Sequence, residues 1–232
     1  MNQWRLGNGA RIIQVLGGRS NVYLIKCHTQ KVLIDTGKNN VWKKLIKKLN
    51  ALGISSIDWL ILTHTHFDHC RNAAQLQQKY DCKIMVSKQA QTFIQNGFTP
   101  LPSGTNFLTG IISQLGKLLG PKRFSYQPFQ VNEFVSSNKT VETGLIKMDL
   151  IPTPGHSSDS LSIVVNNDIA LVGDTLFGVF PKSVMPPYAD DIRLLKLQWQ
   201  KLIDTGCNIF LPGHGRPVSK ELLARFLSKR MA

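Results

Sequence analysis

The sequence is short of acidic residues. Only 14 Asp and Glu stand against 28 Lys and Arg, so the 232-residue chain has a formal net charge of +14. No Asp or Glu occurs from Cys82 to Asn132. A field of this sign attracts anions, so nucleic acids, nucleotides, phosphorylated metabolites and acidic thioesters are all consistent partners. The lysines are not interleaved with aromatic residues, and nucleic acid is therefore not the favoured partner.

Long apolar runs and paired cysteines are also missing. No N-terminal run approaches the roughly 18 apolar residues that cross a bilayer, and no signal-peptide core follows Met1. The 4 cysteines form no Cys-x-x-Cys pair, so neither a zinc knuckle nor a disulfide framework is indicated. We therefore expect a cytoplasmic protein without a transmembrane segment. Its 42% hydrophobic content suffices for a substantial core, and we expect a single domain over residues 1–232.

Histidine is concentrated in one place. Three of the 6 histidines fall in the octapeptide Thr63–Cys70, directly after a short apolar run that is typical of a buried strand. Alternate side chains of an extended segment share a face, so His64 and His66 can reach one metal ion together. Asp68 and His69 are neighbours that should diverge and serve a second ion. Imidazole nitrogen and carboxylate oxygen suit Zn²⁺, and also iron or manganese.

Three more candidate ligands follow, each in a Gly-containing turn after an apolar run that is typical of a strand. They are His156, Asp174 and His214. A carboxylate such as Asp174 can bridge two cations, because its two oxygens have separate lone pairs. The simplest assignment is a site for two divalent ions. It gives His64, His66 and His156 to the first ion and Asp68, His69 and His214 to the second, with Asp174 between them.

Residues outside the ligand set are candidates for supporting roles. Asp35 ends another apolar run, and we expect it to orient a ligand or the turn around the site. Lys182 and Tyr188 lie in the loop 177–188 that follows Asp174, and either is a candidate to bind a substrate oxygen.

Taken in order, these residues resemble the metallo-β-lactamase-fold hydrolase superfamily over most of the chain. The five motifs are Asp35, His64-Thr65-His66-Phe67-Asp68-His69, His156, Asp174 and His214. The resemblance implies an α/β fold of four layers, αββα, in which two mixed sheets pack face to face with helices outside and a binuclear metal site at one edge. A bridging Asp at position 174 implies a thioesterase of the glyoxalase II type, a lactonase, a phosphodiesterase or a ribonuclease. Antibiotic hydrolysis is not expected.

The predicted reaction is attack by a metal-bridging hydroxide on a thioester, lactone or related small-molecule ester. The net charge predicts that this substrate is anionic. Asp68 or Asp174 is expected to accept the proton of water or to orient the hydroxide. Two alternatives stay open. The charge favours a phosphodiesterase or nuclease, and the fold also includes iron-dependent oxidoreductases such as persulfide dioxygenases. His66 replaces the Glu of flavodi-iron relatives, which argues against that branch.

The periodicity of apolar residues predicts alternating strands and helices. We expect strands at residues 10–16, 21–27 and 31–35 and helices at 41–50, 70–80, 87–96, 190–204 and 219–230. Residues 97–135 depart from a minimal sandwich. They begin as an irregular arm and continue as an amphipathic helix that ends at Gly120-Pro121. This insertion could be a lid or pocket wall, a packing element, a homodimer contact or a membrane-surface contact.

Overall fold

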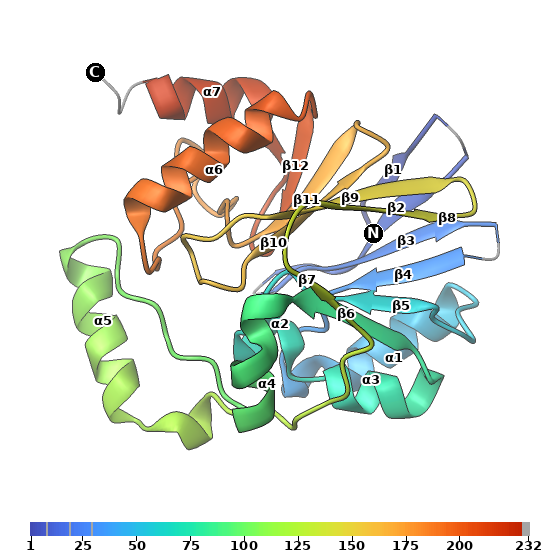
Figure 1. The fold of residues 1–232 in the computed structure, drawn as a ribbon, viewed down its shortest axis with the longest axis horizontal. Coiled ribbons are helices and arrows are strands. Elements are labelled where there is room, and N and C mark those ends of the chain that lie inside the picture. Colours follow the sequence, from blue (N-terminus) through green and yellow to red (C-terminus); the bar gives the residue numbers. More distant parts are fainter. Residues whose placement is uncertain (8, 19, 29, 229–232) are drawn as a thin grey trace.

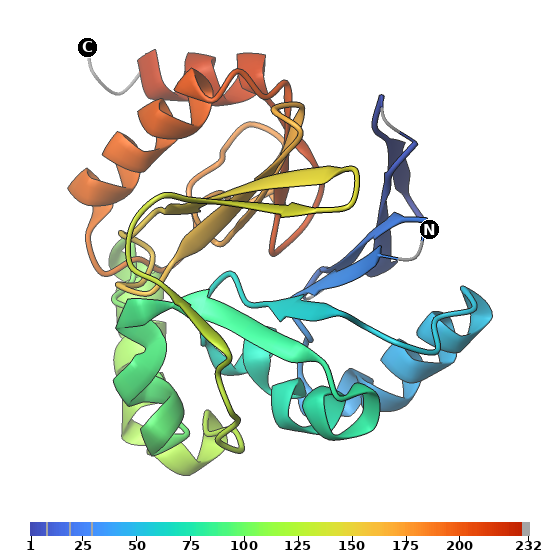
Figure 2. The same ribbon diagram turned by 45° about the vertical axis from the view of Figure 1, so that its right-hand side comes forward.

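The chain folds into two mixed β-sheets that pack face to face, with helices on the outer side of each (Figures 1 and 2). The computed structural model describes residues 1–7, 9–18, 20–28 and 30–228. This arrangement is the four-layer αββα sandwich that the sequence predicts.

The strands of the first sheet follow one another in sequence order. They are β1 (Gln3–Arg5), β2 (Arg11–Leu16), β3 (Val22–Cys27), β4 (Gln30–Ile34), β5 (Trp59–Ile61), β6 (Lys83–Ser87) and β7 (Glu133–Val135). Strands β1 to β4 form an antiparallel meander, whereas β4 to β7 pair in parallel. The parallel half brings the carboxyl ends of β4 and β5 to one edge, where Asp35 and the His-rich octapeptide follow.

The second sheet has the order β13-β12-β11-β10-β9-β8. Its strands are β8 (Lys139–Thr143), β9 (Ile146–Pro152), β10 (Leu161–Val165), β11 (Ile169–Gly173), β12 (Ile209–Pro212) and β13 (Val218–Ser219). Strands β11 and β12 are parallel, and the other pairs are antiparallel. Asp174 and His214 directly follow the parallel pair, and His156 lies just beyond the end of β9. The strand ends of this sheet therefore face the same edge as those of β4 and β5.

Helices cover both outer faces. On the first sheet lie α1 (Trp42–Ala51), α2 (Phe67–Cys70), α3 (Ala73–Tyr80) and α4 (Gln91–Asn96), with the 3-10 turns η1 (Asn39–Val41) and η2 (Lys88–Ala90). On the second lie α6 (Ile192–Asp204) and α7 (Lys220–Ser228). Helix α5 (Phe107–Leu118) and the turn η3 (Pro121–Arg123) stand apart at one side (Figure 1). None of the helices in the described part of the chain is long and apolar enough to cross a bilayer.

Three layers of apolar side chains hold the sandwich together. The central layer joins the inner faces of the two sheets, for example Ile25 and Ile163. One outer layer packs Leu49 of α1 on the first sheet, and the other packs Trp199 of α6 on the second. Alternate residues of a strand face opposite sides, so one strand contributes to both an inner and an outer layer.

The main departures from the predicted elements lie near the carboxyl ends of β4 and β5. The strand predicted at 31–35 ends one residue early, because Asp35 adopts φ 60° and leaves the extended conformation. The helix predicted at 70–80 is split into α2 and α3, and α2 already begins at Phe67. Asp68 and His69 therefore lie on a helical turn and not in an extended segment. The helix predicted at 87–96 is likewise η2 followed by α4.

Two other predicted segments differ at one boundary. Helix α7 begins at Lys220, because Ser219 belongs to β13, and residues 229–230 of the predicted helix 219–230 lie outside the described residues. The segment 97–135 contains the predicted helix as α5, but its last three residues form β7 and belong to the first sheet.

Candidate metal centre

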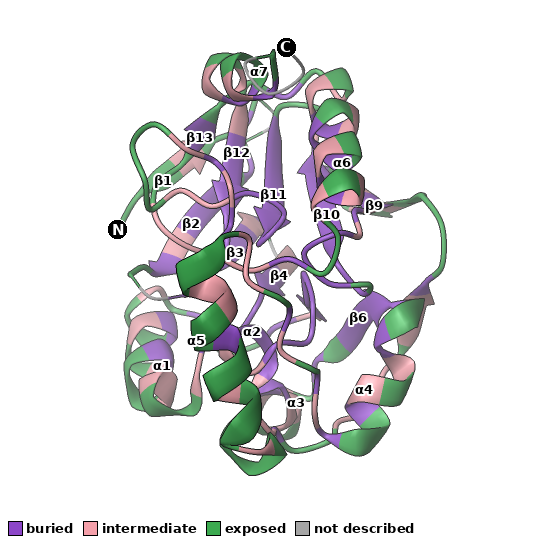
Figure 3. Cartoon of the chain, turned by 90° about the vertical axis from the view of Figure 1, so that its left-hand side faces the viewer, coloured by how far each residue is buried: buried purple, intermediate pink, exposed green. Residues whose placement is uncertain are grey.

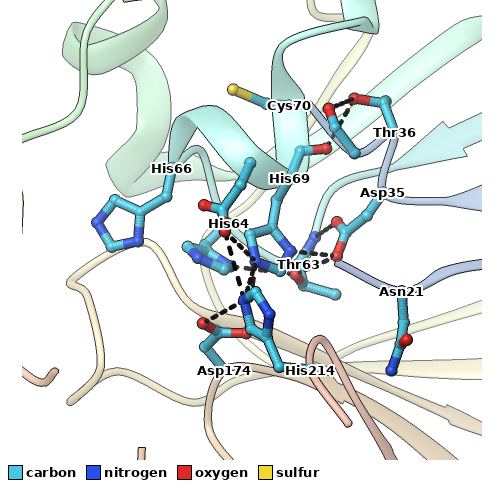
Figure 4. Close-up of polar contacts among 12 residues, drawn as sticks. Asn21, Asp35, Thr36, Thr63, His64, His66, His69, Cys70, Asp174 and His214 are labelled. Carbon is cyan, nitrogen blue, oxygen red and sulfur yellow. Dashed lines mark hydrogen bonds and ion pairs between the residues drawn. The ribbon is translucent and has the colours of Figure 1, made fainter. Parts of the chain in front are cut away.

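The strand ends of both sheets bring all of the candidate ligands together at one edge of the sandwich. Figure 4 shows five of them, His64, His66, His69, Asp174 and His214. Their ligand atoms form three overlapping groups, in each of which the atoms lie within 4.8 Å of one another. The groups are His64, His66 and His156; His64, His69 and Asp174; and Asp68, His69 and His214. The first and third groups are the two ligand sets that the sequence assigns to separate ions.

The first group consists of three buried imidazoles. Nδ1 of His66 lies 3.0 Å from Nε2 of His156, and the rings of His64 and His66 meet edge to face with centroids 4.7 Å apart. Nε2 of His64 is buried and has no hydrogen-bond partner among the described residues. Bonds from zinc to imidazole are about 2.0–2.1 Å long, so nitrogens this close can share one ion. The orphaned nitrogen and the donor set therefore fit a metal.

Backbone carbonyls fix the outer nitrogens of two of these rings. Nε2 of His66 donates to the carbonyl of Pro100 at 3.1 Å, and Nδ1 of His156 donates to the carbonyl of Tyr188 at 2.8 Å. A carbonyl can only accept, so the proton of each neutral ring lies on its outer nitrogen. The inner nitrogen is left with a lone pair that faces the cluster. Contacts of this kind orient the histidines of metal sites.

The third group, Asp68, His69 and His214, combines two imidazoles with a carboxylate. Nε2 of His69 lies 3.3 Å from Nε2 of His214, which in turn lies 3.4 Å from Oδ2 of Asp68. Asp68 and His69 come from the short helix α2, whereas His214 follows β12. The helical turn aims the two neighbouring side chains so that both reach His214.

Asp174 lies between the first and the third group. Its Oδ1 is 3.4 Å from Nε2 of His69, and its Oδ2 is 3.2 Å from Nε2 of His214 and 3.8 Å from Nε2 of His156. Figure 4 shows His69, Asp174 and His214 pointing toward one another. Oδ1 is buried and has no hydrogen-bond partner among the described residues. This placement is the one that a bridging carboxylate requires.

Asp35 forms hydrogen bonds with two residues of the octapeptide. Its Oδ1 accepts a hydrogen bond from the backbone N–H of Thr63, and its Oδ2 accepts from the Thr63 hydroxyl and from Nδ1 of His69, each at 2.8 Å. The proton of the His69 ring is thereby held on Nδ1, which leaves Nε2 facing the cluster. Asp35 thus contacts both the start of the octapeptide and the ring of His69.

Asp159 is a second buried carboxylate of this kind, and the sequence analysis missed it. Its Oδ2 accepts from the backbone N–H and the hydroxyl of Thr65, at 2.8 and 2.6 Å, and its Oδ1 accepts from the hydroxyl of Ser157 at 2.7 Å. It therefore ties the His156 loop to the octapeptide. The available signal was its position three residues after His156, in a loop otherwise made of small polar residues.

The pKa values of the histidines differ between the first and the third group. Burial lowers the pKa of His64 and His66 and brings the pKa of His156 to about 4, so these rings are neutral at pH 7. Burial would also lower the pKa of His69, but the surrounding carboxylates, Asp174 first, outweigh it and raise this pKa to about 9. The pKa of His214 is raised in the same way. The first group thus offers neutral nitrogen donors, whereas the carboxylates around the third group favour positive charge there, as they would at a cation site.

A cavity of about 310 Å³ opens beside the cluster. His66, Asp68, His156, Asp174 and His214 reach its surface. Its remaining walls are largely apolar and include Leu101, Pro102, Ile112, Phe124, Phe177 and Pro187. Lys38 also lines it and brings a positive charge to the cavity.

The two residues suggested for substrate binding are placed differently. Tyr188 lines the cavity beside the cluster. Lys182 instead lines a separate cavity against Leu222 and Arg225 of α7. The loop that follows Asp174 therefore brings Tyr188, and not Lys182, to the cavity beside the cluster.

One wall of the cavity is built where the insertion meets the loop after β11. Gly104 forms an isolated β-bridge with Tyr188. Next to it, Thr105 donates its backbone N–H to the carbonyl of Pro187 at 3.0 Å, and Ala189 donates to the carbonyl of Ser103 at 2.8 Å. Tyr188 also accepts the hydrogen bond from His156, so the same backbone joins the wall to the cluster.

Comparison with known proteins places the chain in one family. A family profile described as the metallo-beta-lactamase superfamily matches residues 15–214. A probable metallo-hydrolase of Methanocaldococcus jannaschii is 27% identical over 202 residues, which cover 86% of this chain and 89% of that protein. A thioesterase of Emericella nidulans is 24% identical over 231 residues, which cover 98% of this chain and 55% of that protein.

Solved structures show the same fold at lower identity. An archaeal metallo-beta-lactamase superfamily protein from Sulfolobus tokodaii superposes with a TM-score of 0.68 at 20% identity, over 95% of this chain and 86% of that one. A subclass B3 metallo-beta-lactamase of Bradyrhizobium japonicum gives a TM-score of 0.72 at 16% identity, over 99% of this chain and 90% of that one. At such identities the likeness concerns the fold alone.

Proposed function

The chain belongs to the metallo-beta-lactamase superfamily, and from its site geometry we propose that it is a hydrolase that uses two divalent metal ions, Zn²⁺ first among them. The proposed ligands are His64, His66 and His156 for one ion and Asp68, His69 and His214 for the other, with Asp174 shared. The observation that carries the proposal is the position of Asp174, whose two oxygens face both groups of ligands at distances of 3.2 to 3.8 Å.

The residues of the cluster have separate tasks in this reaction. When bound, the two cations supply Lewis acidity, which lowers the pKa of water and polarises a carbonyl. Asp68 and Asp174 hold the attacking water in position. His69 and His214 outweigh the effect of burial and keep the pKa of Asp68 low, which makes this carboxylate a weak base. Asp68 therefore orients water better than it removes the proton.

The cavity suggests which esters fit. Its apolar wall accommodates an acyl chain or a ring, and Lys38 offers a cation for an anionic group of the same substrate. We therefore infer that the substrate is a thioester, lactone or related small ester that carries both an apolar and an anionic part. The fungal relative that is named a thioesterase agrees with this class. The net charge of +14 also suits a phosphodiester, which is the second candidate.

A substrate panel tests the proposed class. The metal-loaded protein is assayed with acyl thioesters and lactones of increasing chain length and with bis-p-nitrophenyl phosphate. We expect kcat/KM to rise with the apolar length of the thioester or lactone and to exceed the value for the phosphodiester. Preferential cleavage of the phosphodiester, or of oligonucleotides with a steep salt dependence, would instead establish the second candidate.

Lys38 gives a sharper test of substrate recognition. Three carbonyls, those of Thr36, Gly37 and Lys38 itself, accept hydrogen bonds from the Asn72 side chain, so the backbone that carries Lys38 is fixed. We expect Lys38→Ala to raise KM for a carboxylated ester by about tenfold, since an ion pair at a partly enclosed site is lost. KM for the uncharged analogue should stay the same, and Lys38→Arg should retain most of the affinity. An equal change for both esters would show that Lys38 does not bind the anion.

A further inference from the structure

Helix α5 carries its apolar side chains on the side that faces solvent. Phe107 is 86% exposed and Leu118 is 81% exposed. They belong to a set of large side chains that recur at helical spacing and that we call the α5 apolar face: Phe107, Leu108, Ile111, Leu115, Leu118 and Leu119. Figure 3 shows the helix in front of the sandwich with most of its surface exposed. An amphipathic helix normally turns such a face toward the core.

Small residues make the contact between α5 and the rest of the protein. Ser113 is buried and donates its hydroxyl to the carbonyl of Pro102 at 2.7 Å. Gly104 approaches the helix so closely that a Cβ atom there would lie 2.0 Å from the backbone nitrogen of Gly110. The side of α5 that faces the protein therefore fits closely, and the outward direction of the apolar face is built into the packing.

The amino end of α5 is capped by a capping box. Asn106 accepts from the backbone N–H of Thr109 at 3.0 Å, and the Thr109 hydroxyl accepts from the backbone N–H of Asn106 at 3.1 Å. This reciprocal pair satisfies two backbone donors at the amino end of the helix. The cap fixes where the helix begins, and the side with Ser113 and Gly110 packs on the protein. The apolar face takes part in neither and is available to contact another surface.

Basic side chains gather at one end of the apolar face. Lys117, Lys122 and Arg123 are exposed at or just beyond the carboxyl end of α5. The sequence has no Asp or Glu from Cys82 to Asn132, and the whole chain has a formal net charge of +14. A second copy of the chain would bring the same charges to the contact and would be repelled. The complementary partner is apolar at its centre and anionic at its rim.

We propose that the α5 apolar face docks on the surface of an anionic lipid bilayer. A single convex helix with large apolar side chains needs no shaped groove in a lipid surface, whereas a protein partner would have to supply one. The helix would lie in the plane of the surface, with its apolar face among the acyl chains and the basic residues beside anionic headgroups. This inference goes beyond the proposed hydrolysis and does not depend on it.

The cavity beside the metal ligands lies next to the proposed docking helix. Ile112 lies on the side of α5 next to the apolar face, is 47% exposed and also lines the cavity beside the metal ligands. A docked helix would place the apolar wall of the cavity close to the lipid.

Binding to vesicles tests the proposal without any assay of activity. The full chain is sedimented with vesicles of phosphatidylglycerol and phosphatidylcholine, and in parallel with phosphatidylcholine alone. Wild-type protein should bind the anionic vesicles and retain part of this binding at high salt, because acyl-chain contacts are not screened. Leu108→Ser and Leu118→Ser should each lower the partition coefficient by about tenfold.

A matched control separates the apolar face from the general positive charge. Leu197 of α6 is 66% exposed, as is Leu108, so Leu197→Ser removes the same apolar group at another place. The control should bind as the wild type does. Equal binding by all variants would attribute the effect to net charge and overturn the proposal. No vesicle binding at all would also overturn it, as would a dimer in solution that Leu118→Ser dissociates.

Discussion

Asp174→Ala should release at least one of the two metal ions and lower kcat/KM about a thousandfold. The two carboxylate oxygens face His69, His156 and His214, so both proposed ions lose a ligand at once. Loss of bridging charge and of water orientation removes several kcal/mol of transition-state stabilisation, and each 1.4 kcal/mol corresponds to a factor of ten. The measurement combines metal analysis of the purified variant with initial rates on the best ester.

A control variant keeps this result specific. Glu142 is an exposed carboxylate on β8, and Glu142→Ala should keep the wild-type metal content and rate. Circular dichroism should show the same secondary structure for both variants, because a single side chain at the strand end is replaced. An Asp174→Ala protein with two metal ions and full activity would refute the bridging role.

Asp35→Asn should weaken metal binding by about 10- to 100-fold although Asp35 is not a proposed ligand. The carboxylate accepts three hydrogen bonds, two from Thr63 and one from His69. Asparagine preserves the size of the side chain and tolerates the positive φ of 60° at this position. Its amide group cannot accept as a carboxylate does, so Nδ1 of His69 loses the partner that fixes the ring. Competition with a chelator of known affinity measures the change.

Asp81→Asn is the matched control for this substitution. Asp81 also has a positive φ, 50°, but it is exposed at the end of α3. The Asp81→Asn substitution should leave the metal affinity and the rate of hydrolysis unchanged. If Asp35→Asn and Asp81→Asn bind metal as tightly as the wild type, Asp35 does not orient His69.

Much of the fold and of the candidate site could be predicted because the signals are local. Short apolar runs end at polar residues that lie close in sequence, as at His64, His156, Asp174 and His214, and the observed strands end just before them. The order of these motifs along the chain resembles that of the superfamily, and this resemblance predicted the αββα sandwich. The extended reading of the octapeptide was wrong at Asp68 and His69, since the helix α2 begins at Phe67 and no apolar period is visible over four residues.

Other features depend on tertiary structure and had no residue-type signal. The carbonyls of Pro100 and Tyr188 orient two histidines, but every residue has a carbonyl, and its position follows from the path of the chain. The same is true of Lys38 and Lys182, which a sequence pattern cannot rank by their distance from the cavity. For α5 the spacing predicted the helix correctly, whereas the small residues that decide which side faces the protein act through contacts with distant residues such as Gly104.

The central claim is that the histidine and aspartate cluster holds two metal ions, and metal analysis of the wild-type protein tests it most directly. The protein is purified at neutral pH without chelator, analysed by plasma mass spectrometry, stripped with a chelator and then titrated with Zn²⁺, Mn²⁺ and Fe²⁺. We predict about two metal equivalents per chain, loss of ester hydrolysis on stripping, and its return on titration. A protein that binds no metal at neutral pH, or that hydrolyses its ester equally well after stripping, would contradict the account.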